Sequence, residues 1–322
     1  MAYRSLGHSG LKVSTVCLGA MMFGSGPDAP CSEGESRKII DAFLDAGHNF
    51  IDTANVYTGG QSEEVVGRAI ASRREAVVLA TKGRGPIGPG QNDQGLSRAY
   101  LNRALEGSLR RLGTDYIDLY QCHFPDPDTP IEETMATLDS FVRAGKVRYV
   151  GCSNFTGSQI VEAQWAAARM GSTPFVSLQP RYSLVAREIE SDTLPTCLRQ
   201  GLGTLVYSPL GGGVLTGKYR AGEPAPSDSR AGRSSKTRVN WAAGMLTERN
   251  LRIAEEVSQV AAELGTTPTA VAIAWVLGRR GVTSVIIGPR TFEQYSDNLH
   301  GFDLILEEEV VRRLNTISRR SD

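Results

Sequence analysis

Gly19-Ala-Met-Met-Phe-Gly24 is the stretch that decides the fold class, because it closes the first buried apolar run, Val16–Ala20, and leads toward the first helical pattern. A doubly wound sheet that binds a dinucleotide begins with Gly-x-Gly-x-x-Gly at this turn. That spacing of glycines is absent from the stretch. The first turn therefore argues against such a sheet.

Short apolar runs alternate with longer amphipathic segments along the rest of the chain, as they do in repeated strand–helix units. The expected strands are Val16–Ala20, Asn49–Thr53, Ala76–Lys82, Ile117–His123, Tyr149–Asn154, Pro174–Gln179, Thr204–Ser208 and Thr283–Gly288. The expected helices are Ser36–Ala46, Glu63–Ser72, Ser97–Leu112, Ile131–Ala144, Gly157–Met170 and Glu248–Leu264, with Pro268–Arg279 and Glu307–Ser318 as extra C-terminal helices. This pattern predicts an α/β fold, a (β/α)8 TIM barrel that forms one domain over residues 1–322.

Two segments interrupt the repeats. Arg4–Val13, with Gly7-His8-Ser9-Gly10 at its centre, predicts an N-terminal β-hairpin that closes one end of the barrel. Ala221–Gly244 is rich in Gly, Pro, Ser and Arg and follows the seventh expected strand. Structureless loops of this length are usually functional or mobile, so we expect this one to take part in binding.

The composition excludes several classes of function. The chain of 322 residues contains 35 Lys and Arg and 35 Asp and Glu, a formal net charge of zero. Proteins that bind nucleic acids usually carry a basic excess, so we expect no nucleic-acid partner and no charge-driven attachment to membranes. The five cysteines form no Cys-x-x-Cys pair. No run is long and apolar enough for a membrane span, and the N-terminus lacks the apolar region of a signal peptide, so we expect a cytoplasmic protein.

Polar side chains end three consecutive expected strands, at Asp52, Lys82 and His123, and Tyr57 follows the first of them. Taken singly, each has an ordinary structural explanation, such as a turn cap, an edge charge or a loop aromatic. In a barrel, however, the carboxyl ends of the strands form the active site. A lysine ammonium beside a phenol favours the tyrosinate and lowers the phenol pKa. Tyr57 could then donate a proton to a developing alkoxide while His123 polarises the same oxygen.

No metal site is expected. The four histidines show no spacing typical of metal ligands, and the chain has no Ser-x-x-Lys or Gly-x-Ser-x-Gly motif for acyl transfer.

The motifs at the strand ends occur along the whole chain in a fixed order. They are Phe50-Ile-Asp52-Thr-Ala-Asn-Val-Tyr57, Ala80-Thr-Lys82, Asp118-Leu-Tyr-Gln-Cys-His123, Gly151-Cys-Ser-Asn154, Tyr207-Ser-Pro-Leu-Gly-Gly-Gly213 and Gly288-Pro-Arg-Thr-Phe-Glu-Gln294, followed by Asn298. Together they resemble the aldo-keto reductase family. Ala20, Asn55 and Ser183 depart from residues that are common in the family, and none of these departures touches the four catalytic positions.

The resemblance implies a barrel that reduces aldehydes or ketones with NADPH. Tyr57 would be the proton donor, Asp52 and Lys82 would tune it, and His123 would orient the carbonyl. Ser153, Asn154 and Gln179 would contact the nicotinamide amide, and Tyr207 would stack on its ring. The other implied cofactor contacts are Gly19, Ala20, Met21, Asp52, Ser208, Pro209, Leu210, Gly211, Gly212, Gly213, Lys218, Gly288, Arg290, Gln294 and Asn298, with Arg290 at the 2′-phosphate.

The resemblance implies a small carbonyl compound as the partner. The same machinery would suit a keto-sugar or enoyl-sugar nucleotide reductase. A second alternative is a weakly active NADPH-binding regulatory subunit like the potassium-channel β subunits. The basic residues of the 221–244 loop, Arg230, Arg233, Lys236 and Arg238, are expected to fold over the cofactor phosphates, with Trp241 beside the substrate. The alternative is an exposed linker that is indifferent to the cofactor.

Overall fold

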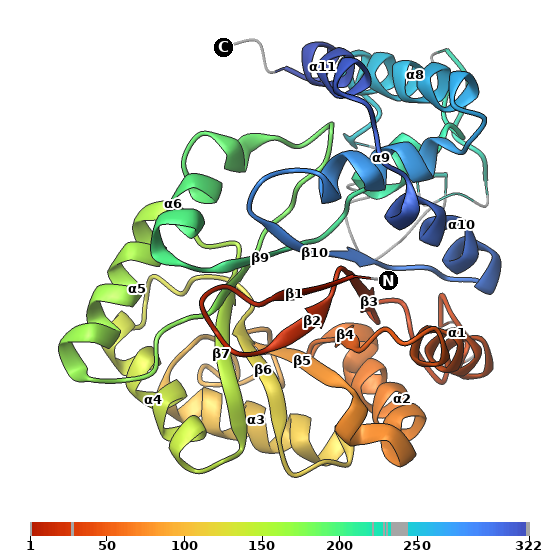
Figure 1. The fold of residues 1–322 in the computed structure, drawn as a ribbon. Helices are drawn as coiled ribbons and strands as arrows, with labels where there is room; N and C mark the ends of the chain where they lie inside the picture. The colour runs from red at the N-terminus through yellow and green to blue at the C-terminus, as the bar shows by residue number, and fades with distance from the viewer. Residues whose placement is uncertain are drawn as a thin grey trace.

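The computed structural model describes residues 2–26, 29–220, 222–227, 229, 231–232 and 244–319. Strands β3 to β10 form a closed parallel barrel in which each strand pairs with the next and β10 returns to β3. The strands are β3 (Val16–Gly19), β4 (Phe50–Asp52), β5 (Val78–Gly83), β6 (Ile117–Cys122), β7 (Val147–Ser153), β8 (Ser177–Gln179), β9 (Gly203–Val206) and β10 (Val282–Ile287). Figure 1 shows the barrel surrounded by helices, so the predicted TIM barrel is confirmed.

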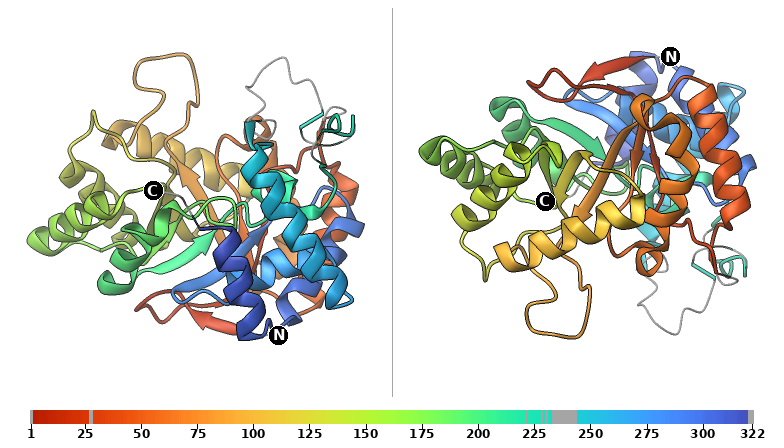
Figure 2. Two further views of the ribbon diagram at one scale, coloured as in Figure 1. Left: turned by 90° about the horizontal axis from the view of Figure 1, so that it is seen from above. Right: turned by 90° about the horizontal axis from the view of Figure 1, so that it is seen from below.

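Helices follow the strands and cover the outside of the barrel (Figures 1 and 2). They are α1 (Glu33–Asp45), α2 (Gln61–Ile70), α3 (Arg98–Leu112), α4 (Ile131–Arg143), α5 (Gly157–Met170), α6 (Thr193–Gln200), α9 (Pro268–Leu277) and α10 (Phe292–Asp303), with short 3-10 turns η1 (Tyr57–Gly60), η2 (Ala71–Ala76), η3 (Glu188–Glu190) and η4 (Gly211–Thr216). The expected helix ends are confirmed where side chains cap them. The side chain of Ser97 accepts a hydrogen bond from the amide of Tyr100 at the start of α3, and Gly113 ends that helix with φ 62°.

The helices α8 (Glu248–Glu263) and α11 (Glu308–Ile317) pack together outside the helical layer of the barrel (Figure 1). The prediction that the segment of α9 is an extra helix outside the barrel units is wrong. α9 packs against β10 and α10, and its residues Thr269 to Val276 are all buried, because α8 covers its outer side. Among the described residues, no single helix is long and apolar enough to span a membrane. Only α8 and α9 taken together have the required length and composition, and the two helices are bent by 101° relative to each other.

The N-terminal hairpin consists of β1 (Tyr3–Ser5) and β2 (Lys12–Ser14), as predicted. Leu6 and Val13 are fully buried and pack against side chains inside the barrel. Gly7 has φ 58°, and a Cβ atom there would lie 2.4 Å from the carbonyl oxygen of Gly201, just before β9. The hairpin therefore closes the amino-terminal end of the barrel and leaves the opposite end for a site (Figure 1).

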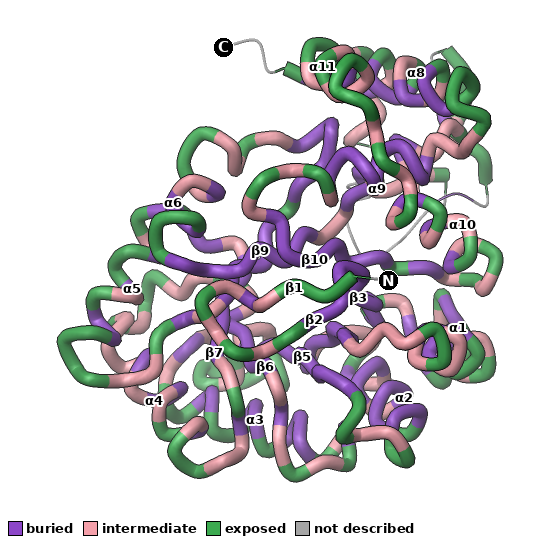
Figure 3. Tube along the Cα trace, in the orientation of Figure 1, coloured by how far each residue is buried: buried purple, intermediate pink, exposed green. Residues whose placement is uncertain are grey.

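The core has one part inside the barrel and a larger part between the strands and the helices, and Figure 3 shows the buried strands ringed by helices with exposed outer faces. All five cysteines are buried and free. Strand register brings the carboxyl ends to similar levels. Gly19 pairs with Asp52, Gly83 with Cys122, and Ser153 with Gln179. The polar residues that end these strands consequently lie around one mouth.

Candidate active site

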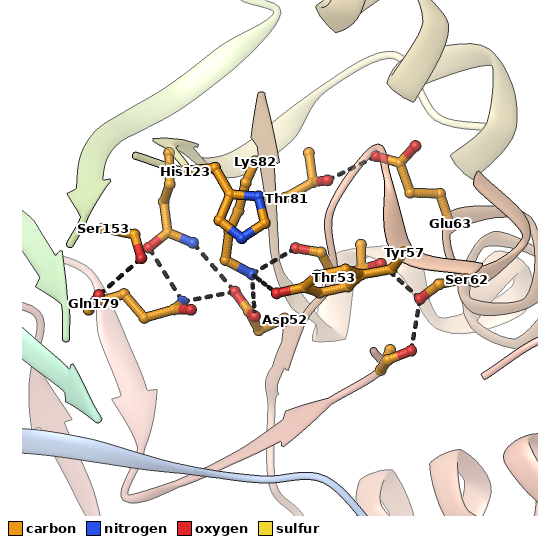
Figure 4. Close-up of polar contacts among 12 residues, drawn as sticks. Asp52, Thr53, Tyr57, Ser62, Glu63, Thr81, Lys82, His123, Ser153 and Gln179 are labelled. Atoms are coloured by element: carbon orange, nitrogen blue, oxygen red, sulfur yellow. Dashed lines mark hydrogen bonds and ion pairs between the residues drawn. The ribbon is translucent and has the colours of Figure 1, made fainter. Parts of the chain in front are cut away.

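Lys82 is the centre of the site, at the carboxyl end of β5, and its side chain is fully buried. Its Nζ atom donates hydrogen bonds to Asp52 Oδ1 at 2.5 Å, to the carbonyl oxygen of Thr53 at 2.8 Å and to Tyr57 Oη at 3.1 Å. Figure 4 shows these contacts meeting at the ammonium group. An ammonium has three donors, so every one has an acceptor and the side chain has no freedom to turn away from Tyr57.

Two glutamines hold the other side of Asp52. Gln121 Nε2 and Gln179 Nε2 donate to Asp52 Oδ2 at 3.1 Å and 2.9 Å. The glutamines on β6 and β8 therefore hold Oδ2 of the Asp52 carboxylate, while Oδ1 forms the ion pair with Lys82 (Figure 4). The role of Gln121 was not predicted, although the residue stands two positions before His123 on the same expected strand.

Tyr57 and His123 face each other beside this ion pair. Tyr57 begins the η1 turn, which reverses the chain through three residues with positive φ, Thr58 (49°), Gly59 (66°) and Gly60 (96°). The rings of Tyr57 and His123 meet edge to face with centroids 5.6 Å apart, and the ring of Phe124 stacks on His123 at 5.0 Å. The structure therefore brings together all four residues predicted to be catalytic.

The electrostatics assign a different protonation state to each group. Burial and the charges of Lys82 and Arg84 lower the pKa of His123 to about 3, so its imidazole is neutral near pH 7 and keeps one N–H donor. Burial alone would lower the pKa of Lys82, but the Asp52 charge, Tyr57 and the hydrogen bonds to both raise it, and Lys82 stays an ammonium.

The pKa of Tyr57 corrects the sequence analysis. Burial raises the pKa of Tyr57, Lys82 opposes that rise, and Asp52 adds to it, with a net direction upward. The lowering expected from Lys82 is present, but burial outweighs it because the phenol lies in a poorly solvated position. Tyr57 consequently holds its proton in this state of the protein.

A cavity of about 1140 Å³ opens at the carboxyl ends of the strands, with Tyr57 and His123 in its wall. Most of the predicted cofactor contacts line it, namely Gly19, Met21, Asp52, Ser153, Asn154, Gln179, Tyr207, Ser208, Pro209, Leu210, Gly212, Gly213, Lys218, Gly288, Arg290, Gln294 and Asn298. Ala20 and Gly211 do not line it. Ala20 is fully buried, and a Cβ atom on Gly211 would lie 2.5 Å from the side chain of Val185, so this glycine faces the core.

At one end of the cavity, a set of polar side chains fits a carboxamide and a flat ring. Asn154 has φ 62°, and its Nδ2 donates to the carbonyl oxygen of His123 at 3.1 Å. Tyr207 Oη donates to Asn154 Oδ1 at 2.9 Å, which fixes the Tyr207 ring in the cavity wall. Ser153 Oγ donates to the carbonyl oxygen of Gln179 at 2.8 Å.

In another part of the cavity lining, backbone and basic side chains fit phosphates. Gly212 and Gly213 have φ 71° and 99°, and with no side chains they let a ligand approach the backbone. Lys218 and Arg290 line the same cavity. The amide of Arg290 donates to Gln294 Oε1 at 3.0 Å at the start of α10, where a helix N-terminus favours an anion. The residues present therefore fit a phosphorylated dinucleotide.

The sequence model described as the Aldo/keto reductase family matches residues 15–319. The chain belongs to the aldo/keto reductase family. An uncharacterized oxidoreductase of Bacillus subtilis, YrpG, is 42% identical over 98% of this chain and 96% of its own length.

Two further relatives have more specific names. A probable voltage-gated potassium channel subunit beta of Arabidopsis thaliana is 40% identical over 95% of this chain and 92% of its own. The norsolorinic acid reductase of Aspergillus flavus is 35% identical over 95% of this chain and 78% of its own. Family and relatives together support an oxidoreductase.

Some site features of this aldo/keto reductase were missed or lie outside the described residues. Arg84 lines the cavity and was not predicted, although it follows Lys82 by two positions at a strand end. Within the described residues no three His, Cys, Asp or Glu side chains are placed to hold a metal ion. The predicted loop residues Arg230, Arg233, Lys236, Arg238 and Trp241 lie outside the described residues.

Proposed function

We propose that this aldo/keto reductase uses NADPH to reduce an aldehyde or ketone to the alcohol, with Tyr57 as the proton donor. The observation that carries the proposal is the ammonium of Lys82, held between Asp52 and Tyr57 at 2.5 Å and 3.1 Å at the head of a cavity that fits a dinucleotide.

The proton comes from Tyr57. Burial keeps Tyr57 protonated before reaction, so it can donate to an oxygen on which negative charge develops. Lys82 then stabilises the tyrosinate that remains, because its Nζ atom is within hydrogen-bond distance of the phenol oxygen. Asp52, held by Gln121 and Gln179, keeps Lys82 charged and in place.

His123 orients the carbonyl. Its imidazole is neutral and lies across the edge of the Tyr57 ring, so one N–H can donate to the same substrate oxygen. A second donor at that oxygen positions the carbonyl carbon and adds to the stabilisation of the alkoxide.

The cofactor, when bound, supplies the hydride. Ser153, Asn154 and Gln179 would hold its carboxamide, and Tyr207 its ring. Gly212, Gly213 and Lys218 would hold the pyrophosphate, and Arg290 with Gln294 the 2′-phosphate end.

The test is NADPH oxidation by the purified protein with an aromatic aldehyde, a 1,2-dicarbonyl and a keto sugar, and product analysis for the alcohol. We expect oxidation that depends on the carbonyl compound and yields one alcohol per NADPH. Preferred turnover of the keto sugar would instead favour a sugar reductase. Bound NADPH with no product from any compound would contradict the proposal.

A second candidate follows from the 40% identity to a protein named as a potassium channel β subunit. In that case the protein would bind NADPH tightly and turn over slowly with every carbonyl compound. Cofactor retained through gel filtration, together with product release slower than chemistry in single-turnover experiments, would favour this function.

A further inference from the structure

Arg84 lies beside the reacting groups. In the pairing of β5 with β6, Gly83 is level with Cys122, and the amide of His123 donates to the carbonyl oxygen of Gly83 at 3.0 Å. Arg84, the next residue, therefore leaves the barrel next to His123 and lines the same cavity. Most predicted cofactor contacts lie at or after the carboxyl ends of β7, β8, β9 and β10. Because Arg84 follows β5, we expect it to lie on the side of the cavity that takes the substrate.

The backbone of Arg84 adopts a conformation that favours glycine, with φ 147°. Such a conformation costs free energy for a residue with a side chain and persists when its surroundings impose it. Here the Arg84 amide donates to Tyr100 Oη at 3.1 Å, and the Arg84 carbonyl oxygen accepts from the amide of Gly95 at 3.0 Å.

Tyr100 is fully buried on α3, and its hydroxyl also fixes the residues around Arg84. It donates to the carbonyl oxygen of Gly85 at 2.5 Å and accepts from Asn55 Nδ2 at 2.9 Å. The chain thus builds a rigid support for an arginine at a position where glycine would be less strained. We therefore infer that the Arg84 side chain has a function in the cavity that glycine could not provide.

Among the described residues, no side chain accepts a hydrogen bond from the Arg84 guanidinium. Arg84 Nε is buried without a hydrogen-bond acceptor, and no ion pair joins Arg84 to another described residue. Arg84 is among the charges that lower the pKa of Asp126, but Asp126 Oδ2 accepts its hydrogen bonds from the amide of Leu96 and the hydroxyl of Thr129, at 2.7 Å each, and not from Arg84. A guanidinium without a hydrogen-bonded acceptor among the described residues can give its accessible N–H groups to a ligand anion.

The wall around Arg84 is apolar. Val56, Pro86 and Phe124 line the same cavity, and Phe124 is 45% exposed while its ring stacks on His123. A single planar guanidinium beside such a wall matches a carboxylate on an aryl or alkyl body, because its N–H groups can bind both carboxylate oxygens.

We propose that Arg84 binds a carboxylate of the carbonyl substrate, so that the enzyme selects aldehydes or ketones that carry an acid group away from the reacting carbon. This inference rests on the proposed function, since the carbonyl must lie at Tyr57 and His123 at the same time.

The test compares 4-carboxybenzaldehyde with its methyl ester, which has the same body without the charge. We expect the enzyme to show the higher kcat/KM for the acid. Arg84→Gln should lower kcat/KM for the acid about tenfold or more, mainly through KM, since a charge-assisted pair is lost. Its effect on the ester should be under about twofold, and Arg84→Lys should give an intermediate loss for the acid.

Two further variants control for folding. Arg84→Gly relieves the backbone at φ 147° and should show the same selective loss as Arg84→Gln. Arg110→Gln removes an exposed arginine of α3 that is away from the cavity and should change neither substrate. Equal kcat/KM for acid and ester in the unmodified enzyme, or equal losses for both in the Arg84 variants, would overturn the proposal.

A binding measurement separates this inference from the proposed function. Calorimetry should show benzoate binding more tightly than benzamide, and this preference should disappear in Arg84→Gln. If neither aldehyde is reduced but the preference depends on Arg84, the reductase function fails and the anion site stands. Benzoate binding that is unchanged in Arg84→Gln would reject the anion site itself.

Discussion

Among the single residues of the site, Lys82 is expected to act on Tyr57 through its charge. Lys82→Met removes the ammonium 3.1 Å from the phenol oxygen, so the pKa of Tyr57, already raised by burial, should rise further. Reduction needs the protonated phenol, so activity is lost as pH rises through the pKa of Tyr57. The alkaline limb of the kcat/KM profile should therefore move to higher pH or leave the accessible range, and the rate should fall because the tyrosinate loses its cation.

Asp52→Asn is the matched control, because it leaves the lysine in place. Because the Asp52 charge raises the pKa of Tyr57, its removal should move the limb to lower pH, opposite to Lys82→Met. Circular dichroism should show both variants folded. A pH profile of Lys82→Met that coincides with the unmodified enzyme would mean that another group tunes Tyr57.

We expect Arg290, which lines the cavity, to determine the choice of cofactor. Arg290→Ala should weaken NADPH binding about tenfold or more, because a charge-assisted hydrogen bond contributes roughly 1.5–3 kcal/mol. NADH lacks the 2′-phosphate and should bind almost as before. Fluorescence titration of both cofactors measures the difference, and Lys218→Ala, expected to weaken both, serves as the comparison. Equal losses of NADPH and NADH affinity in Arg290→Ala would place the 2′-phosphate elsewhere.

At the scale of secondary-structure elements, the packing of α2 on α3 positions the η1 turn that carries Tyr57. A Cβ atom at Gly67 of α2 would lie 2.3 Å from the carbonyl oxygen of Leu112, a backbone atom at the end of α3. Gly67→Ala should therefore lower the free energy of unfolding by about 1–3 kcal/mol, although alanine is the better helix former. Urea denaturation measures this change.

Gly34→Ala in α1 is the control, since a Cβ atom there would have no neighbour within 4 Å. It should be neutral or stabilise by about 0.5–1 kcal/mol. Equal stability changes in the two variants would show that α2 and α3 are not in close contact at Gly67.

Element positions were predicted well where the local pattern decides them. The ends of α3 at Ser97 and Gly113 were predictable because capping depends only on the few residues at a helix end. The neighbours of α8 and α9 were not predictable, since an amphipathic pattern tells which side of a helix is buried but not which element covers it.

At the scale of the whole molecule, the convergence of Asp52, Tyr57, Lys82 and His123 was predictable, because a closed parallel barrel brings all its carboxyl strand ends to one mouth. The site properties that were missed arise from contacts between distant segments. The role of Arg84 depends on Tyr100 of α3, and the upward pKa shift of Tyr57 depends on burial by the assembled cavity wall.

The most direct test of the central claim is Tyr57→Phe, which removes the hydroxyl and keeps the ring. With 4-carboxybenzaldehyde and its methyl ester, the turnover number should fall on the order of 10²–10⁴-fold, the contribution typical of a general acid. The affinity for NADPH in a fluorescence titration should stay within about twofold, because Tyr57 is not among the residues expected to hold the cofactor and the ring remains. A Tyr57→Phe enzyme that reduces both compounds at the rate of the unmodified enzyme would contradict Tyr57 as the proton donor.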